Sequence, residues 1–272
     1  MVTADDFGLT PGTSQAILEA HRSGIVTAVS VLGNGPATLA TLNLLDDVPD
    51  LEVGVHVALV GEDPPLSPAH TIPTLVDRKG RLPTSWRRLL SDLIRRRIDP
   101  DDIRTELDAQ VALVGSGDHR LTHLNLHQHV HLWPSVRPLV LEAAAAHDIA
   151  YVRTPRSSRR SPSGLAIRAL ARMLATSLAS ADLATSDRFL GLDEAGAWDG
   201  DSLRGALATV QGSVVEVNVH PGAPEDSARD RYRWGYQWGS ELAALVDPST
   251  RAVASRAGFR LAGPSAVGRS AP

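Results

Sequence analysis

Short apolar segments alternate along this chain with longer segments that have the periodicity of amphipathic helices. The predicted strands cover residues 25–32, 51–59, 122–132, 149–153, 213–219 and 259–261. The predicted helices cover residues 11–24, 37–45, 86–97, 100–114, 134–147, 165–183, 201–210, 240–246 and 250–257. Strands that alternate with helices pair in parallel and are joined by helical crossovers. The pattern therefore predicts an α/β fold built on a mostly parallel sheet.

Residues 122–132, with the sequence THLNLHQHVHL, contain four of the ten histidines of the chain. Four histidines and one asparagine occupy alternate positions: His123, Asn125, His127, His129 and His131. Successive side chains of a strand point to opposite faces, so a strand here has one imidazole-rich face and one apolar face. A helix would align some of these rings but fits the alternation less well. Pro134 suits the first turn of a following helix, which places the histidines near the C-terminal end of a strand, where α/β folds build their sites.

Neutral imidazole is the commonest metal ligand in proteins, so this face predicts a metal site. A single histidine is more often a hydrogen-bonded core or surface residue, but four buried rings on one face would all need partners. A tetrahedral or octahedral site has room for about two or three protein nitrogens. We therefore expect the remaining histidines to contact substrate or to be structural.

Polar groups also mark other strand ends. Asp5 and Asp6 follow only about three residues, which predicts a stunted first strand or a start further upstream. His56 lies in the strand predicted over residues 51–59, and His220 follows the alternating segment 213–219. Two imidazoles and a carboxylate can hold a divalent ion, while a second carboxylate takes a proton from water and an acid protonates the leaving group.

Composition excludes several classes of protein. With 272 residues, one barrel-sized domain is expected, over residues 1–262, followed by a disordered tail at 263–272. The absence of cysteine excludes disulfides, thiolate metal sites and a cysteine nucleophile. A net charge of -4 gives no nucleic-acid footprint. Without a membrane-length apolar run or a leader pattern, we expect no membrane partner and a cytoplasmic protein.

An aromatic segment stands out in a chain that is 4% aromatic: residues 231–238, with the sequence RYRWGYQW. Its aromatic residues have alternate spacing, which is compatible with a core segment, a sugar-stacking platform or a dimer contact. The Pro-rich segment 61–83 predicts a long loop beyond a strand end, and such loops often carry substrate contacts.

Five segments resemble the YdjC-like carbohydrate deacetylases, a family that includes chitooligosaccharide deacetylase. They are ADDFG at 4–8, GIVTAVSVLGNGPA at 24–37, VGVHVAL at 53–59, THLNLHQHVH at 122–131 and HPG at 220–222. The resemblance implies a distorted (β/α) barrel similar to that of the NodB-type polysaccharide deacetylases. It also implies hydrolysis of an N-acetyl group from an amino sugar or short chitooligosaccharide, with release of acetate, and commonly a homodimer.

Residue by residue, the resemblance implies that Asp6, His56 and His127 hold one divalent metal ion. This donor set is rich in histidine and free of thiols, and it favours zinc, with magnesium as the alternative. The resemblance further implies that Asp5 is the general base and His220 the general acid.

Further residues are expected to contact or orient the substrate. We expect Arg153 to orient Asp5 or the sugar, and His129 and Trp234 to contact the sugar. The family usually has Asp-Ser where this chain has Asn125 and Leu126, so His127 is expected to lack the carboxylate that would tune it.

Other functions share the same residues. A hydrolase of another amide or of an acyl ester would use the same metal site, and a catalytically silent sugar-binding relative would keep the same barrel. A Ser-His-Asp hydrolase is disfavoured because the chain has no G-x-S-x-G motif.

Overall fold

The fold is taken from a computed structural model of the chain and is described for residues 1–267. Across these residues, seven strands form one sheet in the order β5-β4-β3-β2-β1-β7-β6, and neighbouring strands are all parallel. The strands are β1 (Val2–Phe7), β2 (Ala28–Leu32), β3 (Glu52–Val57), β4 (Leu121–Leu126), β5 (Tyr151–Val152), β6 (Arg188–Leu190) and β7 (Val215–Val219). A parallel bridge from Tyr151 to Ala184, just before β6, brings the two outer strands together. The predicted distorted (β/α) barrel is thus confirmed.

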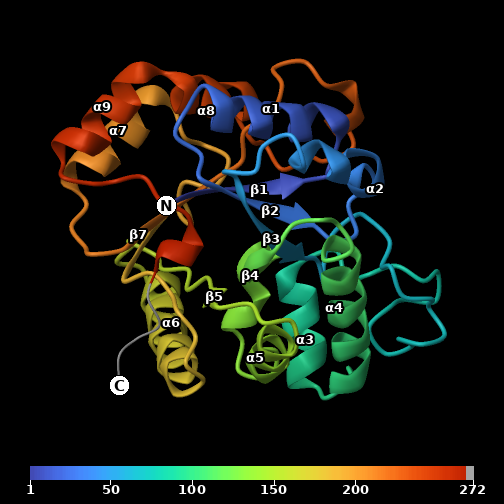
Figure 1. Cartoon of the computed structure of the whole chain (residues 1–272). Coiled ribbons are helices and arrows are strands. Elements are labelled where there is room, and N and C mark those ends of the chain that lie inside the picture. The colour runs from blue at the N-terminus through green and yellow to red at the C-terminus, as the bar shows by residue number, and fades with distance from the viewer. Residues whose placement is uncertain (268–272) are drawn as a thin grey trace.

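Helices surround these strands (Figure 1). They are α1 (Pro11–Arg22), α2 (Thr38–Thr41), α3 (Trp86–Ile94), α4 (Pro100–Val114), α5 (Arg137–Ala146), α6 (Pro162–Ser180), α7 (Gly200–Thr209), α8 (Trp238–Val246) and α9 (Pro248–Arg256). Caps that can be read from the sequence begin several of them: Thr10 caps α1 and Asp99 caps α4, each with proline in the first turn. In Figure 1, α1, α7, α8 and α9 lie on one side of the strands and α3 to α6 on the other.

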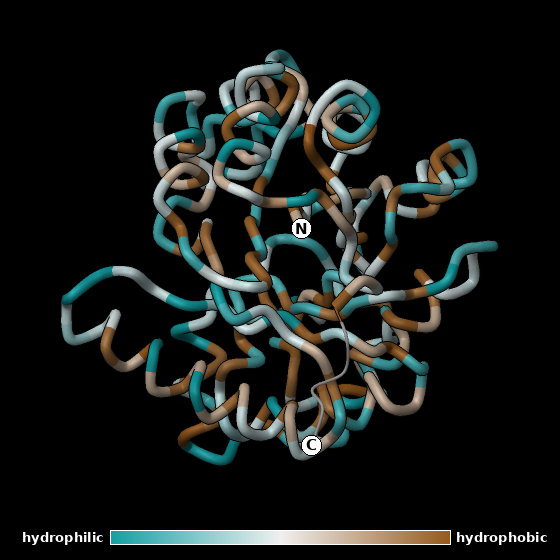
Figure 2. Tube along the Cα trace, turned by 60° about the vertical axis from the view of Figure 1, so that its left-hand side comes forward, coloured by the Kyte–Doolittle hydropathy of each residue, from teal (hydrophilic) through white to brown (hydrophobic). Residues whose placement is uncertain are grey.

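The strands have apolar sequences because most of their side chains are buried. Strand residues such as Val29, Val55 and Leu124 are fully buried in one large hydrophobic cluster, and hydrophilic stretches mark much of the periphery (Figure 2). The barrel interior, in contrast, holds charged groups, among them Asp5, Arg153 and Glu216. Because each buried charge needs a partner, these inward positions carry the polar network described below.

The histidine-rich segment differs from the prediction. It was expected to be one strand over residues 122–132, but β4 ends at Leu126 and His127–Leu132 form a 3-10 turn, η2. Gln128 and His129 have positive φ angles of 52° and 53°. The alternation of polar and apolar residues gives no information on the backbone φ angles. A turn with left-handed residues that keeps the same alternation is therefore predicted, wrongly, as a continuation of the strand. Only His123 and Asn125 of the set therefore lie on the strand.

The two ends of the chain also differ from expectation. The first strand is not stunted, since β1 includes the two aspartates and spans six residues. Residues 259–261 form no strand, whereas β6 was not predicted. Of the predicted tail 263–272, Pro264–Ala266 form a 3-10 turn and Ser265 donates to Glu52 from its backbone nitrogen at 2.8 Å, while residues 268–272 lie outside the described part.

The predicted loop at residues 61–83 contains neither helix nor strand, as expected. Within residues 1–267, none of the helices combines the length and the apolar character that a membrane crossing requires.

Candidate active site

Two adjacent carboxylates lie at the C-terminal end of β1, Asp5 and Asp6, each 1% exposed. Asp6 has a φ of 68°, and the pairing of β1 with β2 shifts register between Ala4 and Phe7. A regular strand would send neighbouring side chains to opposite faces, so this local kink allows both carboxylates to serve one site.

Asp6, His56 and His127 bring three possible ligand atoms within 4.8 Å of one another. His56 Nε2 lies 3.2 Å from His127 Nδ1, and Asp6 Oδ1 lies 3.5 Å and 3.8 Å from these two nitrogens. Tetrahedral ligands on zinc bonds of about 2.0 Å lie about 3.3 Å apart. The three separations are therefore compatible with ligands that converge on a single ion.

The electrostatics of this triad also fit a cation. Both carboxylate oxygens of Asp6 are buried and have no hydrogen-bond partner among the described residues. Burial, and then the charge of Asp5, raises the pKa of Asp6 well above its usual range. Burial lowers the pKa of His56, and it lowers that of His127 to about 3, so both rings are neutral and offer lone pairs. A divalent ion bound here would supply the positive charge that stabilises the ionised form of Asp6.

Asn125 contacts His56 rather than His127, which corrects the expected placement. The parallel register of β3 and β4 sets His56 opposite Asn125, whose side-chain amide forms a short hydrogen bond with His56 Nδ1. An amide oxygen at this contact accepts the Nδ1 proton but turns the amide nitrogen toward the Arg153 guanidinium, which is also a donor. With the proton on Nδ1, the lone pair of Nε2 faces the ion site. The reversed amide would accept from Ser30 and Arg153 but would push the His56 proton to Nε2, so ion binding is linked to the orientation of Asn125.

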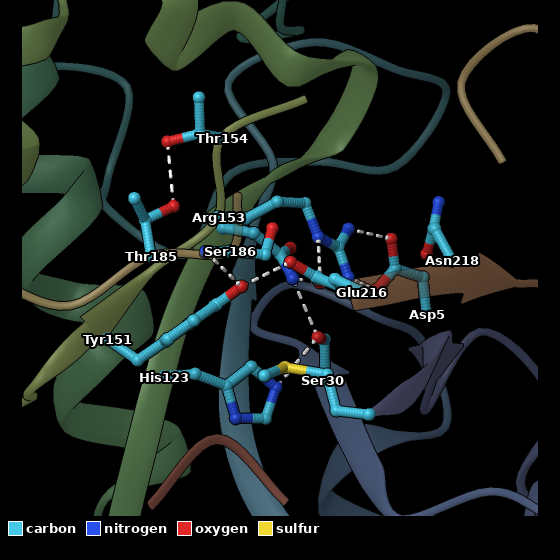
Figure 3. Close-up of polar contacts among 12 residues, drawn as sticks. Asp5, Ser30, His123, Tyr151, Arg153, Thr154, Thr185, Ser186, Glu216 and Asn218 are labelled. Atoms are coloured by element: carbon cyan, nitrogen blue, oxygen red, sulfur yellow. Dashed lines mark hydrogen bonds and ion pairs between the residues drawn. The ribbon is translucent and has the colours of Figure 1, made fainter. Parts of the chain in front are cut away.

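A buried network holds Asp5 in place (Figure 3). Arg153, 1% exposed, donates to the two oxygens of Asp5 at 2.5 and 2.9 Å and from Nε to Glu216 at 2.6 Å. The Tyr151 hydroxyl donates to the other oxygen of Glu216 at 2.7 Å. Burial alone would raise the pKa of Asp5, but the charge of Arg153, the neighbouring His56 and the hydrogen bonds from Arg153 together outweigh burial and hold that pKa well below its usual range. Asp5 is thus a fixed, ionised carboxylate.

His220 follows β7 and lies close to the same pocket. Its backbone nitrogen donates to the buried Glu241 at 2.5 Å, and its ring centre lies 4.9 Å from that of Tyr236. Its Nε2 is 3.5 Å from the amide nitrogen of Asn218, and its Nδ1 is buried with no partner in residues 1–267. Burial lowers the pKa of His220 to about 4, so the ring is neutral at pH 7.

A cavity of about 420 Å³ opens above these groups. It is lined by six of the residues singled out in the sequence, namely Asp5, His56, His127, His129, His220 and Trp234. Asp6 and Arg153 do not line it, and both are 1% exposed. Arg153 therefore supports Asp5 and has no open path to a ligand in this pocket.

The other two histidines of the histidine-rich segment are structural. His123 bonds to Ser30 and Thr122 through its two ring nitrogens, and His131 Nε2 lies 3.0 Å from the backbone oxygen of Arg153. This agrees with the expectation that a metal site leaves room for only some of the rings.

The aromatic segment 231–238 divides between core and site. Tyr232 is buried, and its hydroxyl donates to Asp63 at 2.8 Å. Trp234 packs at 5.2 Å from the ring of His127 and donates to Glu62 at 3.1 Å. Trp234 and Tyr236 both line the pocket, so the segment forms part of its wall.

Sequence reasoning missed two residues that matter to this site. Glu216 is a charged residue within the apolar strand β7, and that anomaly was a usable signal. Trp86 lines the pocket from the start of α3, where its sequence position after a long loop was the available hint.

Comparisons with known proteins agree with this geometry. Residues 1–256 match the family described as YdjC-like protein. A carbohydrate deacetylase of Geobacillus stearothermophilus is 31% identical over 96% of this chain and 94% of its own length. A chitooligosaccharide deacetylase of Enterobacter sp. (strain 638) is 30% identical, with 96% of each chain covered.

The fold has a counterpart among solved structures. A crystal structure of an Enterococcus faecalis V583 protein superposes with a TM-score of 0.79 at 24% identity and 97% coverage of both chains. That likeness supports the fold alone. On the match over residues 1–256 and the nearly full-length similarity to the two deacetylases, the chain belongs to the YdjC-like family.

Proposed function

We propose that this protein hydrolyses the N-acetyl group of an amino sugar or short chitooligosaccharide, releases acetate and requires one divalent ion. The observation that carries the proposal is the convergence of Asp6, His56 and His127 within 4.8 Å, under a pocket that also contains Asp5 and His220. Relatives that align along almost the whole chain are named carbohydrate and chitooligosaccharide deacetylases. We take residues 1–262 to be one catalytic domain.

Asp6, His56 and His127 would hold the ion, with zinc as the first choice and magnesium as the alternative. Two neutral imidazoles and one carboxylate suit zinc, whereas magnesium prefers oxygen ligands. When bound, such an ion supplies Lewis acidity, which lowers the pKa of water and polarises a carbonyl oxygen.

Asp5 acts as the general base in this proposal. Arg153 keeps it ionised and fixes both of its oxygens, so Asp5 can accept a proton from the attacking water in one orientation. The same pairing makes Asp5 a weak base, because its pKa lies well below its usual range. Its function therefore depends on a water molecule that is already more acidic than bulk water.

His220 acts as the general acid. The carbon–nitrogen bond breaks with transfer of a proton to the departing amine, and His220 is the titratable group that follows β7 and lines the pocket. Its ring is neutral in the free protein, since burial lowers its pKa to about 4. Negative charge that develops on the substrate favours the imidazolium form, so His220 would gain its proton within the reaction cycle.

His129 and Trp234 would contact the sugar. Both line the pocket. The buried Nδ1 of His129 has no hydrogen-bond partner within the described residues. Trp234 offers an aromatic face to the apolar side of a pyranose. Arg153 orients Asp5 rather than the sugar.

Elemental analysis of the purified protein, paired with acetate release from di-N-acetylchitobiose with and without a chelator, tests the proposal. We expect about one equivalent of zinc or a similar ion and acetate release that the chelator abolishes. Bound metal without acetate release would point to another amide or an acyl ester as substrate. Absence of metal binding after zinc loading would overturn the proposal in favour of a silent sugar-binding relative.

The homodimer and the cytoplasmic location remain predictions. Light scattering coupled to size-exclusion chromatography measures the first, and cell fractionation measures the second.

A further inference from the structure

Trp86 is a large aromatic residue left open at the mouth of the active-site pocket. It begins α3, is 43% exposed and lines the same cavity as Asp5, His56 and His127. Ligand pockets are lined mainly by apolar and aromatic side chains, so an accessible indole in the lining of this pocket is a candidate ligand contact. The proposed mechanism does not use it.

The position of Trp86 is set by contacts on both its backbone and its ring. Its backbone nitrogen donates to Gln128 Oε1 at 2.8 Å, and the Arg87 guanidinium lies 4.9 Å from its ring centre. Gln128 follows His127 directly and has a positive φ of 52°. The turn that carries a proposed metal ligand therefore also fastens the start of α3, which keeps Trp86 in place relative to the site.

The residues that line the pocket differ in how exposed their side chains are. Asp5 and His56 are 1% and 2% exposed, Trp234 is half-buried, and Trp86 is the most open of these four residues. Trp234 packs at 5.2 Å from the ring of the proposed ligand His127, whereas Trp86 lies on the more exposed part of the pocket wall. We therefore expect a sugar ring that packs on Trp86 to lie further from the metal site than one that packs on Trp234. A cavity of about 420 Å³ falls within the size range of pockets that hold ligands larger than a single small ring.

We propose that Trp86 forms a second sugar subsite and stacks on the pyranose next to the one that carries the acetyl group. This inference rests on the proposed function and assigns a residue to its specificity: Trp86 would let the pocket discriminate a chain of two sugars from a single N-acetylated sugar. A pyranose presents an apolar face of C–H groups to an indole ring, while the exposed Arg87 offers donors to sugar hydroxyls at the rim.

The experiment compares kcat/KM for di-N-acetylchitobiose with kcat/KM for N-acetylglucosamine, using the zinc-loaded full-length protein. We expect Trp86→Ala to lower the ratio of the two by roughly tenfold, which corresponds to about 1.4 kcal/mol. Trp86→Phe should recover most of the ratio because it keeps an aromatic face. The matched control is Ile94→Ala, on the same helix but outside the pocket, which should keep the wild-type ratio. An unchanged ratio in Trp86→Ala would overturn the inference.

A binding measurement separates failure of this subsite from failure of the proposed function. Chitobiose carries no acetyl group, so calorimetric titration measures its binding without turnover. Binding that Trp86→Ala weakens roughly tenfold supports the subsite, even if the wild-type protein releases acetate from neither sugar. Equal binding by wild type and Trp86→Ala overturns the subsite, whatever the outcome of the acetate assay.

Discussion

Asp5 and Asp6, adjacent in β1, flank the two nitrogens of a single imidazole. Asp5 Oδ2 lies 3.7 Å from Nδ1 of His56, and Asp6 Oδ1 lies 3.5 Å from its Nε2. The positive φ of Asp6 makes this possible, because neighbours in a regular strand point to opposite faces. One histidine thus stands between the proposed base and the proposed ion site and helps to set their separation.

Replacement of Asp6 by asparagine should abolish metal binding without disturbing the fold. Asparagine tolerates a positive φ, so the backbone is kept, while the anionic ligand is lost. Zinc should raise the Tm of the wild-type protein, since it binds the folded state, and should leave the Tm of Asp6→Asn unchanged. Thermal unfolding with and without zinc measures this. An equal zinc-induced shift in both proteins would contradict the assignment of Asp6.

Loss of the Arg153 guanidinium should destabilise the protein strongly. Arg153→Met leaves Asp5 and Glu216 buried without their partner, and breaking a buried ion pair in this way costs about 3–5 kcal/mol. Arg153→Lys should cost less, because the charge remains while the paired hydrogen bonds to Asp5 are lost. Urea unfolding at pH 7 gives the free energies. A wild-type value for Arg153→Met would show that the network contributes nothing.

Stability should fall as the pH is lowered from about 6.5 to about 4, in part through His220. The pKa of His220 is about 4 in the folded protein and about 6.5 when unfolded, so the unfolded state binds the proton in this window and is favoured. The contribution is at most about 3 kcal/mol. His220→Gln, which does not titrate, should have a shallower pH slope. Urea titrations of the metal-free proteins across this range measure it, and identical slopes would exclude a role for His220.

Asn125 should control metal affinity through His56. Asn125→Leu removes the amide whose oxygen, when it faces His56, keeps the proton on Nδ1, and we expect zinc affinity to fall by about 10-fold or more. Asn125→Asp supplies a charged acceptor at the same place and should raise the affinity. Competition with a chromophoric chelator measures both variants. Equal zinc affinities in the wild-type protein, Asn125→Leu and Asn125→Asp would contradict the proposed effect of Asn125 on the ion site.

Local sequence signals were sufficient for most of the elements and for many of the reactive residues. The helices that begin at Pro11 and Pro100 start where the pattern placed them. Asp5, Asp6, His56 and His220 were singled out because polar groups interrupt apolar segments near strand ends. Such interruptions carry information because burying a polar group without a partner is costly.

Backbone handedness and strand register were not visible in the same signals. The alternation of His127, His129 and His131 suggested a strand, yet they lie in a turn with left-handed residues. Asn125 was expected beside His127 but lies beside His56, because the pairing of β3 with β4 places it there. An alternation of polar and apolar residues predicts neither the φ angles of a turn nor the register between two strands.

By itself the sequence determined the kind of fold and the chemistry that it can carry. The alternation of strands and helices specifies a mostly parallel sheet, the resemblance to a known family implies that it is a barrel, and the residues near the strand ends supply carboxylates and imidazoles. The tertiary structure alone decided which of them meet: Arg153 reaches Asp5 across 148 positions of sequence, and Trp86 comes to the mouth of the pocket. Periodicity depends on local backbone geometry, whereas these contacts depend on how distant strands and loops pack, which no local pattern encodes.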